Sequence, residues 1–331
     1  MCGIVGYVGD RDCADVLVDA LSKLEYRGYD SGGIAVFEKG TIKVEKCKGR
    51  LANLVDKMAV DGKPQGHCGI GHTRWATHGE PSDINSHPHG NKRVSIVHNG
   101  IIENYKQIRD FLVEEGYSFV SETDTETVAK LLDYYYVDDP VDTIIKVLSE
   151  IKGSYALGIM FRDYPDTVFA VRKESPLIVG VGENENFLAS DVPAIIKYTR
   201  DYYLLEANEI AVVKKDSVQI YDMHKEPVHK EINTADWDVD AAEKGGYEHF
   251  MLKEIHEQPA AVRDTVSPRI INGMPDLSQD GVDMQKLKDY RQIFIVACGT
   301  AMHAGMVGKY VIEKLARKPV IVDIASEFRY R

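Results

Sequence analysis

Strand-like and helix-like patterns of apolar residues alternate along the first half of the chain. The apolar run at the start predicts a buried strand, and the helical spacing of apolar residues that follows predicts an amphipathic helix. We expect strands at residues 1–9, in two segments between 33 and 49, in a segment leading into GHTRWATHG, and at 94–100, and helices at 13–24, about 50–59, 102–116, 125–137 and after Pro140.

The pattern changes to short strands from residue 154 to about residue 221. Strands, then consecutive helices, then strands again predict two sheets with helices packed outside them, an α+β layered domain. The polar segment 222–246 predicts a linker, and residues 247–266 predict a helix despite Pro259.

A strand, a tight turn, a helix and a second strand are expected between residues 291 and 326. This order is the opening of a parallel α/β unit. The sequence ends at Arg331 after one crossover, and a single βαβ unit cannot bury both faces of a parallel sheet. We therefore expect the natural protein to continue.

Composition and charge narrow the classes of partner. The chain has 331 residues, 44% of them hydrophobic, and a formal net charge of −12 at pH 7, which argues against binding to nucleic acid. The first residues lack the charged and apolar regions of a signal peptide, and no apolar stretch reaches membrane-spanning length, so we expect neither feature. Five cysteines without metal-like spacing fit reduced thiols, so we expect a cytoplasmic protein whose partners are small molecules and protein subunits.

Cys2 is a candidate nucleophile. Removal of Met1 is expected because the second residue is small, and it would leave one residue with both a thiol and a free α-amino group. That amine has an ordinary pKa of about 7.7–8.0 and can act as the base for the thiol. The alternative is that Cys2 is a small buried apolar residue at the start of a strand.

Three polar motifs offer further candidates, each with an alternative. Arg74 carries a planar fork suited to a carboxylate or phosphate, or it is an ion-paired arginine beside a packing Trp75. Asn99 and Gly100 present donors for an oxyanion hole, or they form a tight turn. Asp124 holds a substrate ammonium, or it caps the N-terminus of a helix.

Histidines are concentrated between residues 67 and 98, which raises the question of a metal site. The sequence there matches neither the HExxH nor the CxxC pattern, and we expect no metal. Six of the eleven histidines lie in this stretch: His67, His72, His78, His87, His89 and His98.

Taken together, the motifs resemble the glutaminase domain of the N-terminal-nucleophile (class II) glutamine amidotransferases. Within that family they are most similar to the branch that transfers ammonia to fructose 6-phosphate. The motifs that carry the resemblance are MCGIVGY, LEYRGYDSGGIAV (24–36), GHTRWATHGEPS (71–82), HNGIIENY (98–105), SETDTE (121–126), KGSYAL (152–157) and FMLKEIHEQP (250–259).

The resemblance implies a four-layer αββα sandwich and a role for each matching residue. It implies a glutaminase domain at 1–240, a linker and connecting helix at 241–284, and an incomplete SIS (sugar isomerase) domain at 285–331. The implied roles are Cys2 as the nucleophile towards L-glutamine, Asn99 and Gly100 as oxyanion donors, Arg74 with Thr77 and His78 at the α-carboxylate, Asp124 at the α-ammonium, Trp75 beside the ammonia route, and Arg27 near the nucleophile.

The SIS resemblance rests on the motif ACGTAMHAG. It implies that Gly299 and Thr300 contact a sugar phosphate, although Ala301 stands where the family usually has serine. The alternative is a plain strand-to-helix turn. The resemblance also implies a homodimer formed through SIS domains and a mechanism that needs neither metal nor cofactor. Two other functions stay open: an amidotransferase for another sugar phosphate, and a non-catalytic fragment that binds sugar phosphate.

Overall fold

The computed structural model describes residues 2–76, 79–235, 246–328 and 330 of the chain. The chain divides into two compact units, Met1–Gly245 and Gly246–Arg331, which are described separately here.

The first unit contains an eight-stranded antiparallel sheet. Its strand order is β14-β11-β9-β10-β1-β4-β2-β3, so the first strand of the chain lies inside the sheet. The strands are β1 (Gly3–Val8), β2 (Ser31–Glu38), β3 (Thr41–Lys48), β4 (Cys68–Arg74), β9 (Ile178–Val181), β10 (Asn186–Ala189), β11 (Asp201–Leu204) and β14 (Asn233–Thr234).

A second antiparallel sheet packs on the first. Its six strands have the order β13-β12-β8-β7-β6-β5. They are β5 (His89–Gly90), β6 (Val94–Ile102), β7 (Gly153–Phe161), β8 (Val168–Lys173), β12 (Ile210–Val213) and β13 (Val218–Tyr221).

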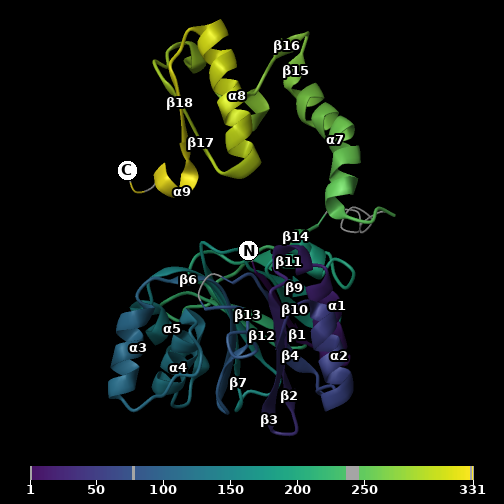
Figure 1. Cartoon of the computed structure of the whole chain (residues 1–331), viewed down its shortest axis with the longest axis vertical. Helices are drawn as coiled ribbons and strands as arrows, with labels where there is room; N and C mark the ends of the chain where they lie inside the picture. Colours follow the sequence, from purple (N-terminus) through teal and green to yellow (C-terminus); the bar gives the residue numbers. More distant parts are fainter. Residues whose placement is uncertain (1, 77–78, 236–245, 329, 331) are drawn as a thin grey trace. The chain divides into compact units, whose positions relative to one another are not determined.

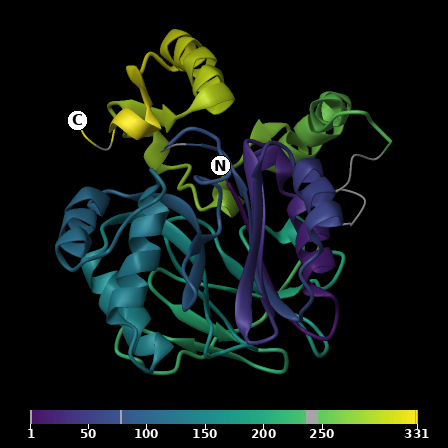
Figure 2. The ribbon, with the colours of Figure 1, turned by 60° about the horizontal axis from the view of Figure 1, so that its bottom comes forward.

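Helices cover the outer face of each sheet (Figures 1 and 2). One outer layer is α1 (Cys13–Ser22) and α2 (Leu51–Asp61), and the other is α3 (Tyr105–Glu114), α4 (Asp124–Tyr135) and α5 (Pro140–Glu150). Short 3-10 turns lie at η1 (Glu25–Arg27) and η2 (Val192–Ala194). Three hydrophobic clusters separate the four layers, one under each helical layer and one between the sheets. The αββα sandwich is confirmed.

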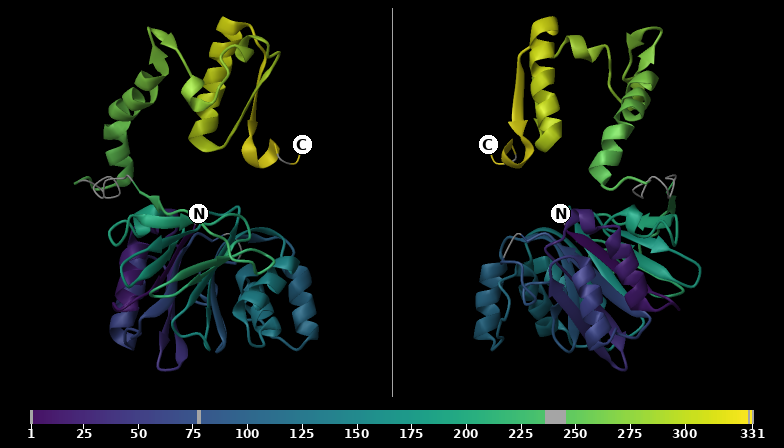
Figure 3. Two further views of the ribbon diagram at one scale, coloured as in Figure 1. Left: turned by 180° about the vertical axis from the view of Figure 1, so that it is seen from behind. Right: turned by 45° about the vertical axis from the view of Figure 1, so that its right-hand side comes forward.

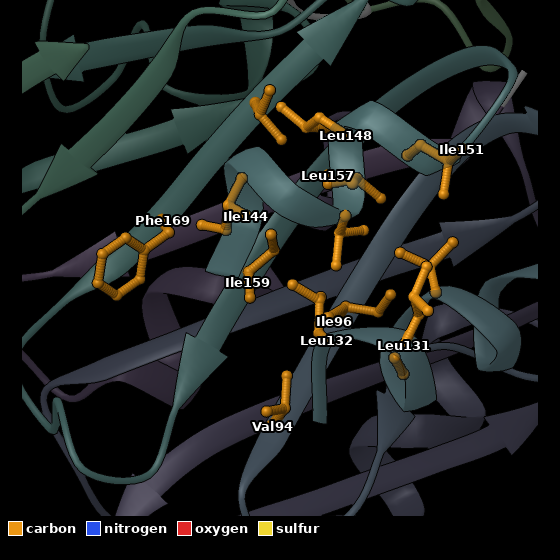
Figure 4. Close-up of a cluster of buried hydrophobic side chains, with 14 of the residues drawn as sticks. Val94, Ile96, Leu131, Leu132, Ile144, Leu148, Ile151, Leu157, Ile159 and Phe169 are labelled. Carbon is orange, nitrogen blue, oxygen red and sulfur yellow. The ribbon is translucent and has the colours of Figure 1, made fainter. Parts of the chain in front are cut away.

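Strand β7 shows how the sequence builds these layers. Tyr155, Leu157 and Ile159 belong to the cluster beneath α3, α4 and α5, whereas Ala156 and Met160 belong to the cluster between the sheets. Figure 4 shows Leu157 and Ile159 among the side chains of the helices. Because successive side chains of a strand point to opposite faces, the apolar run that begins at Tyr155 fits a sheet buried on both sides.

Several predicted boundaries shift. Strand β6 extends through Ile102, so the helix expected at 102–116 begins at Tyr105. Strands β5, β11 and β14 were not predicted, and two of them are only two residues long, too short for a period to show. The predicted linker 222–246 contains β14, and its residues 236–245 lie outside the described residues.

The second unit contains a helix followed by a parallel strand pair. Helix α7 (Phe250–Val266) runs through Pro259, as the sequence predicts. Strands β17 (Ile293–Ala297) and β18 (Val320–Ile324) pair directly and in parallel. Helix α8 (Gly299–Ala316) connects them, as Figure 3 shows. The remaining elements are η3 (Ser267–Arg269), β15 (Ile270–Ile271), β16 (Met274–Pro275), η4 (Ser278–Asp280), η5 (Lys286–Lys288) and α9 (Ala325–Phe328).

This βαβ unit leaves apolar side chains uncovered, as expected of one crossover. Phe294 on β17 is 52% exposed, and Val307 and Leu315 on α8 are also exposed. Among the described residues, no helix has both the length and the apolar composition that crossing a membrane requires.

Candidate active site

A pocket of about 400 Å³ in the first unit brings together seven of the predicted site residues. Residues from both sheets and from the start of α4 line it, although they are far apart in sequence. The lining consists of Cys2, Arg27, Arg74, Trp75, His87, His98, Asn99, Gly100, Ile101, Thr123, Asp124, Thr125, Ser154, Ser175 and Pro176.

Four other predicted residues are not part of this lining. Thr77 and His78 lie outside the described residues. Gly299 and Thr300 begin α8 of the second unit, and Cys298 alone separates them from β17; Gly299 has a φ of +58°. The turn from strand to helix that the sequence predicts is therefore present.

Cys2 lies immediately before β1 and is half-buried, so it is not a core residue of that strand. The backbone N–H of Trp75 donates to the Cys2 sulfur at 3.1 Å, and the thiol lies 3.5 Å from the Trp75 carbonyl oxygen. Burial raises the pKa of the Cys2 thiol, and the N–H donated by Trp75 opposes that shift. The group is therefore a thiol at neutral pH and needs a base to become a nucleophile.

Asn99 joins the second sheet to Cys2. Its side-chain Nδ2 donates to the backbone carbonyl oxygen of Cys2 at 3.0 Å, and its Oδ1 lies 3.0 Å from His72 Nε2. The interpretation of Asn99 and Gly100 as a tight turn is wrong, because both residues lie within β6 and pair with β7. Nδ2 carries a second hydrogen, and Asn99 lines the pocket.

Gly100 has a backbone that a larger residue would strain. Its φ is +132°, and a Cβ there would lie 2.1 Å from the Ser154 carbonyl oxygen. We expect Gly100→Ala to lower the free energy of unfolding by about 1–3 kcal/mol more than Gly116→Ala does. Gly116 is the matched control, because its φ is also positive, at +89°, and nothing lies within 4 Å of a Cβ there. Urea unfolding followed by circular dichroism measures both, and equal losses would contradict the steric argument.

Arg74 and Asp124 place opposite charges in the same pocket. Arg74 ends β4, is 4% exposed, and donates from Nη2 to the Gly79 carbonyl oxygen at 3.1 Å. Asp124 is also buried, and its Oδ2 accepts from the backbone N–H of Ile102 at 2.8 Å. A guanidinium and a carboxylate in one pocket match the carboxylate and the ammonium of a free amino acid.

The N-cap interpretation of Asp124 is wrong. Helix α4 begins at Asp124, and the capping residue is Thr123, whose Oγ1 accepts from the backbone N–H of Glu126 at 3.3 Å. Glu126 in turn accepts from the backbone N–H of Ser121 at 2.6 Å. These bonds resemble a capping box, and they leave the Asp124 carboxylate to the pocket.

Arg27 and Trp75 lie at the edge of the site. The Arg27 Nη2 is 3.2 Å from the Asp191 carboxylate, and its Nη1 donates to the Ser190 carbonyl oxygen at 3.3 Å. Trp75 is 46% exposed and contacts the Tyr29 ring edge-on, with 5.6 Å between ring centroids. Trp75 thus offers an apolar surface next to the cysteine.

Four buried histidines form a cluster at the pocket, and two of them, His87 and His98, belong to its lining. His72 and His87 stack with 4.1 Å between ring centroids, and His89 contacts His87 edge-on at 4.9 Å. His98 joins them through its backbone N–H, which donates to His87 Nδ1 at 3.3 Å. Burial lowers the pKa of each of these rings, to about 3 for His72, so all four are neutral at pH 7.

Hydroxyl groups at the start of α4 bond to three of these rings. His98 Nδ1 lies 3.0 Å from Thr125 Oγ1, and His89 Nε2 lies 3.1 Å from Thr123 Oγ1. His72 Nδ1 and His98 Nε2 have no hydrogen-bond partner among the described residues. Among the described residues, no group of three or more histidine, cysteine or acidic side chains is arranged to hold a metal ion. The concentration of histidines in the sequence therefore corresponds, for these four, to a hydrogen-bonded network.

The contact between His72 and Asn99 was not predicted from the sequence. The alternation of side chains along β4 and β6 could have indicated this contact. Ile70 and Val97 both face the layer between the sheets, and His72 and Asn99 follow them two positions later on the same faces.

Known proteins resemble this chain over its whole length. Residues 72–197 match the family described as the glutamine amidotransferase domain, and residues 286–331 match the SIS domain. The glutamine–fructose-6-phosphate aminotransferase (isomerizing) of Caldanaerobacter subterraneus subsp. tengcongensis is 58% identical over 335 residues, which cover 100% of this chain and 55% of that protein. The protein of the same name from Clostridium acetobutylicum is 58% identical over 334 residues, with the same coverage.

The chain thus spans about half the length of the curated relatives that it matches. A solved structure shares the fold at lower identity: a glutamine phosphoribosylpyrophosphate amidotransferase from B. subtilis, with a TM-score of 0.62 and 18% identity. That similarity covers 97% of this chain and 65% of the other.

Proposed function

We propose that the chain is the part of a glutamine–fructose-6-phosphate aminotransferase that it spans, and that its first unit hydrolyses L-glutamine to glutamate and ammonia. One observation carries the proposal. A half-buried cysteine, an asparagine amide bonded to that cysteine's backbone, and a buried arginine and aspartate line a single pocket.

Glutamine would bind through its α-amino-acid group. Its carboxylate meets the Arg74 guanidinium, with Thr77 and His78 as further donors, and its ammonium meets the Asp124 carboxylate. Both charged side chains are largely withdrawn from water, which strengthens each contact. The side-chain amide of the substrate then extends towards Cys2.

The reaction would proceed through a thioester. With Met1 removed, the α-amino group of Cys2 takes the thiol proton, and the sulfur attacks the γ-amide carbon. Asn99 Nδ2 and the Gly100 N–H donate to the negative oxygen that forms. Ammonia leaves with the proton that the amine returns, and water then cleaves the thioester to release glutamate and restore the thiol. Arg27 and Trp75 flank the reacting centre, Trp75 on the path by which ammonia leaves.

The same proposal extends to the protein as a whole. We infer that ammonia passes to fructose 6-phosphate to form glucosamine 6-phosphate, with Gly299 and Thr300 contributing to the phosphate site of an SIS domain. Domain limits of 1–240, 241–284 and 285–331, and a homodimer formed through the SIS domains, belong to this proposal. So does a cytoplasmic location, which the five free cysteines support.

A glutaminase assay tests the proposal. The chain, with loss of Met1 verified by intact mass, should release glutamate from glutamine. Asn99→Ala should lower kcat by about 10²–10³-fold with a small change in KM, because the amide acts mainly on the transition state. Asn53→Ala is the control, since Asn53 lies on α2, outside the pocket lining, and its amide donates to the carbonyl oxygen of the exposed Lys48. Absence of glutamate release from the wild-type chain lacking Met1 would refute the proposal.

A further inference from the structure

We propose that His72 is a positioning residue that sets which way the Asn99 carboxamide faces, an inference that rests on the glutaminase function proposed above. His72 is not in the lining of the pocket and does not touch the place where glutamine would bind. It acts through Asn99, whose Oδ1 it holds at 3.0 Å.

The hydrogen bonds around Asn99 fix the direction of its amide. A backbone carbonyl oxygen can only accept, so the group that lies 3.0 Å from the Cys2 carbonyl is the Asn99 NH₂. Oδ1 therefore faces His72. The second neighbour of His72 Nε2 is the His98 carbonyl oxygen at 3.1 Å, which is also an acceptor. With two acceptors on one nitrogen, the hydrogen of the neutral ring is on Nε2, which donates to both.

The surroundings of His72 keep the ring in this single state. The ring is fully buried and stacks on His87 with 23° between the ring planes. Its Nδ1 has no hydrogen-bond partner among the described residues. Protonation would bury a second N–H without an acceptor, and rotation of the ring would break both bonds at Nε2.

Loss of the His72 Nε2–H donor would change which atom of the Asn99 amide faces the oxyanion. His72 belongs to β4 of the eight-stranded sheet and Asn99 to β6 of the six-stranded sheet, so the bond crosses between the layers. Without it, the buried Asn99 Oδ1 has no donor at this position, and only the bond from Nδ2 to the Cys2 carbonyl oxygen opposes a turn of the amide. A turned amide presents oxygen instead of N–H to a developing negative charge, which opposes the reaction.

Three substitutions of His72 separate the role of the donor from that of packing. Glutamine places its amide nitrogen near the position of Nε2, asparagine places it near Nδ1, and leucine supplies no donor. We expect His72→Leu to lower kcat for glutamine hydrolysis by about 10–10²-fold with KM nearly unchanged, because only the transition state needs the amide. His72→Gln should retain most of the activity, and His72→Asn should lose about as much as leucine.

A double-mutant comparison distinguishes this role from a general structural one. If His72 acts through Asn99, adding His72→Leu to Asn99→Ala should lower kcat by less than about twofold further. The same loss in both backgrounds, or wild-type kcat for His72→Leu, would overturn the proposal. If His72→Leu fails to fold, the comparison of His72→Gln with His72→Asn tests the proposal instead. Equal kcat values for those two variants would overturn the proposal. Activity of the wild-type chain in the same assay keeps this outcome separate from failure of the glutaminase proposal.

Discussion

Replacing Cys2 with alanine is expected to abolish the release of glutamate from glutamine. The substitution removes the sulfur that forms the thioester, and loss of a nucleophile typically costs well over about 10⁴-fold in kcat. The fold should persist, because Cys2 is half-buried and lies before β1 rather than within it. Glutamate release and the urea midpoint, measured on the same preparation, test both parts.

Cys68→Ala provides the control for Cys2→Ala. Cys68 is buried between the two sheets, outside the pocket lining, and burial raises the pKa of its thiol far above neutral pH. This variant should keep most of the glutaminase activity. Activity in Cys2→Ala, or loss of activity in a folded Cys68→Ala, would show that the nucleophile has been wrongly assigned. Intact mass should show loss of Met1 in the wild-type chain, since a retained methionine would block the proposed base.

The buried histidine cluster is expected to make the first unit unstable in mild acid. His72, His87, His89 and His98 all have pKa values lowered by burial, so they stay neutral in the folded state while an unfolded histidine takes up a proton below about pH 6.5. Their contribution to stability is therefore complete above pH 6.5 and is lost as the pH falls towards their folded pKa values. At pH 5.5 the loss is about 1.4 kcal/mol for each of His72, His87 and His89, whose pKa values are lowered furthest, or about 4 kcal/mol for the three together.

Urea unfolding between pH 7.5 and 5.5 measures this loss. Few carboxylates titrate in that range, so the slope of the free energy of unfolding against pH reports mainly the histidines. His89→Gln should lower the slope by about one proton, whereas His224→Gln, at an exposed position, should leave it unchanged. A free energy of unfolding that does not vary over this range would contradict the assignment of four neutral buried rings.

The layered fold could be read from the sequence because its strands carry strong patterns. The continuous apolar run of β7 and the helical spacing of α1 each identify the element and the face that it buries. Strand β11 gave no such signal, since both Asp201 and Leu204 are exposed. Its place in the sheet depends on pairing with β9 and β14, which local periodicity does not encode.

The residues of the candidate site could be predicted where they belong to a recognisable motif. Their local structure was harder to predict where it depends on contacts in the folded chain. Cys2, Arg74, Asn99 and Asp124 were singled out from motifs, and the structure brings their side chains to one pocket. The true cap of α4 and the strand position of Asn99 and Gly100 were not fixed beforehand. The strand position of Asn99 and Gly100 depends on pairing with β7, which lies far along the chain. The cap is a local bond, made by Thr123 one position before the residue that the sequence suggested.

The nucleophile and its amide donor belong to different sheets, with Cys2 before β1 and Asn99 on β6. Their separation is therefore governed by the thickness of the side-chain layer between the sheets, to which Ile4, Ile70 and Val97 contribute. Close packing transmits a change in the volume of that layer to both faces. Substitutions in this layer can therefore change turnover, although the substituted residues do not contact the substrate. Selection for turnover would then act on the interior of the sandwich, because that interior sets the distance between the reacting groups.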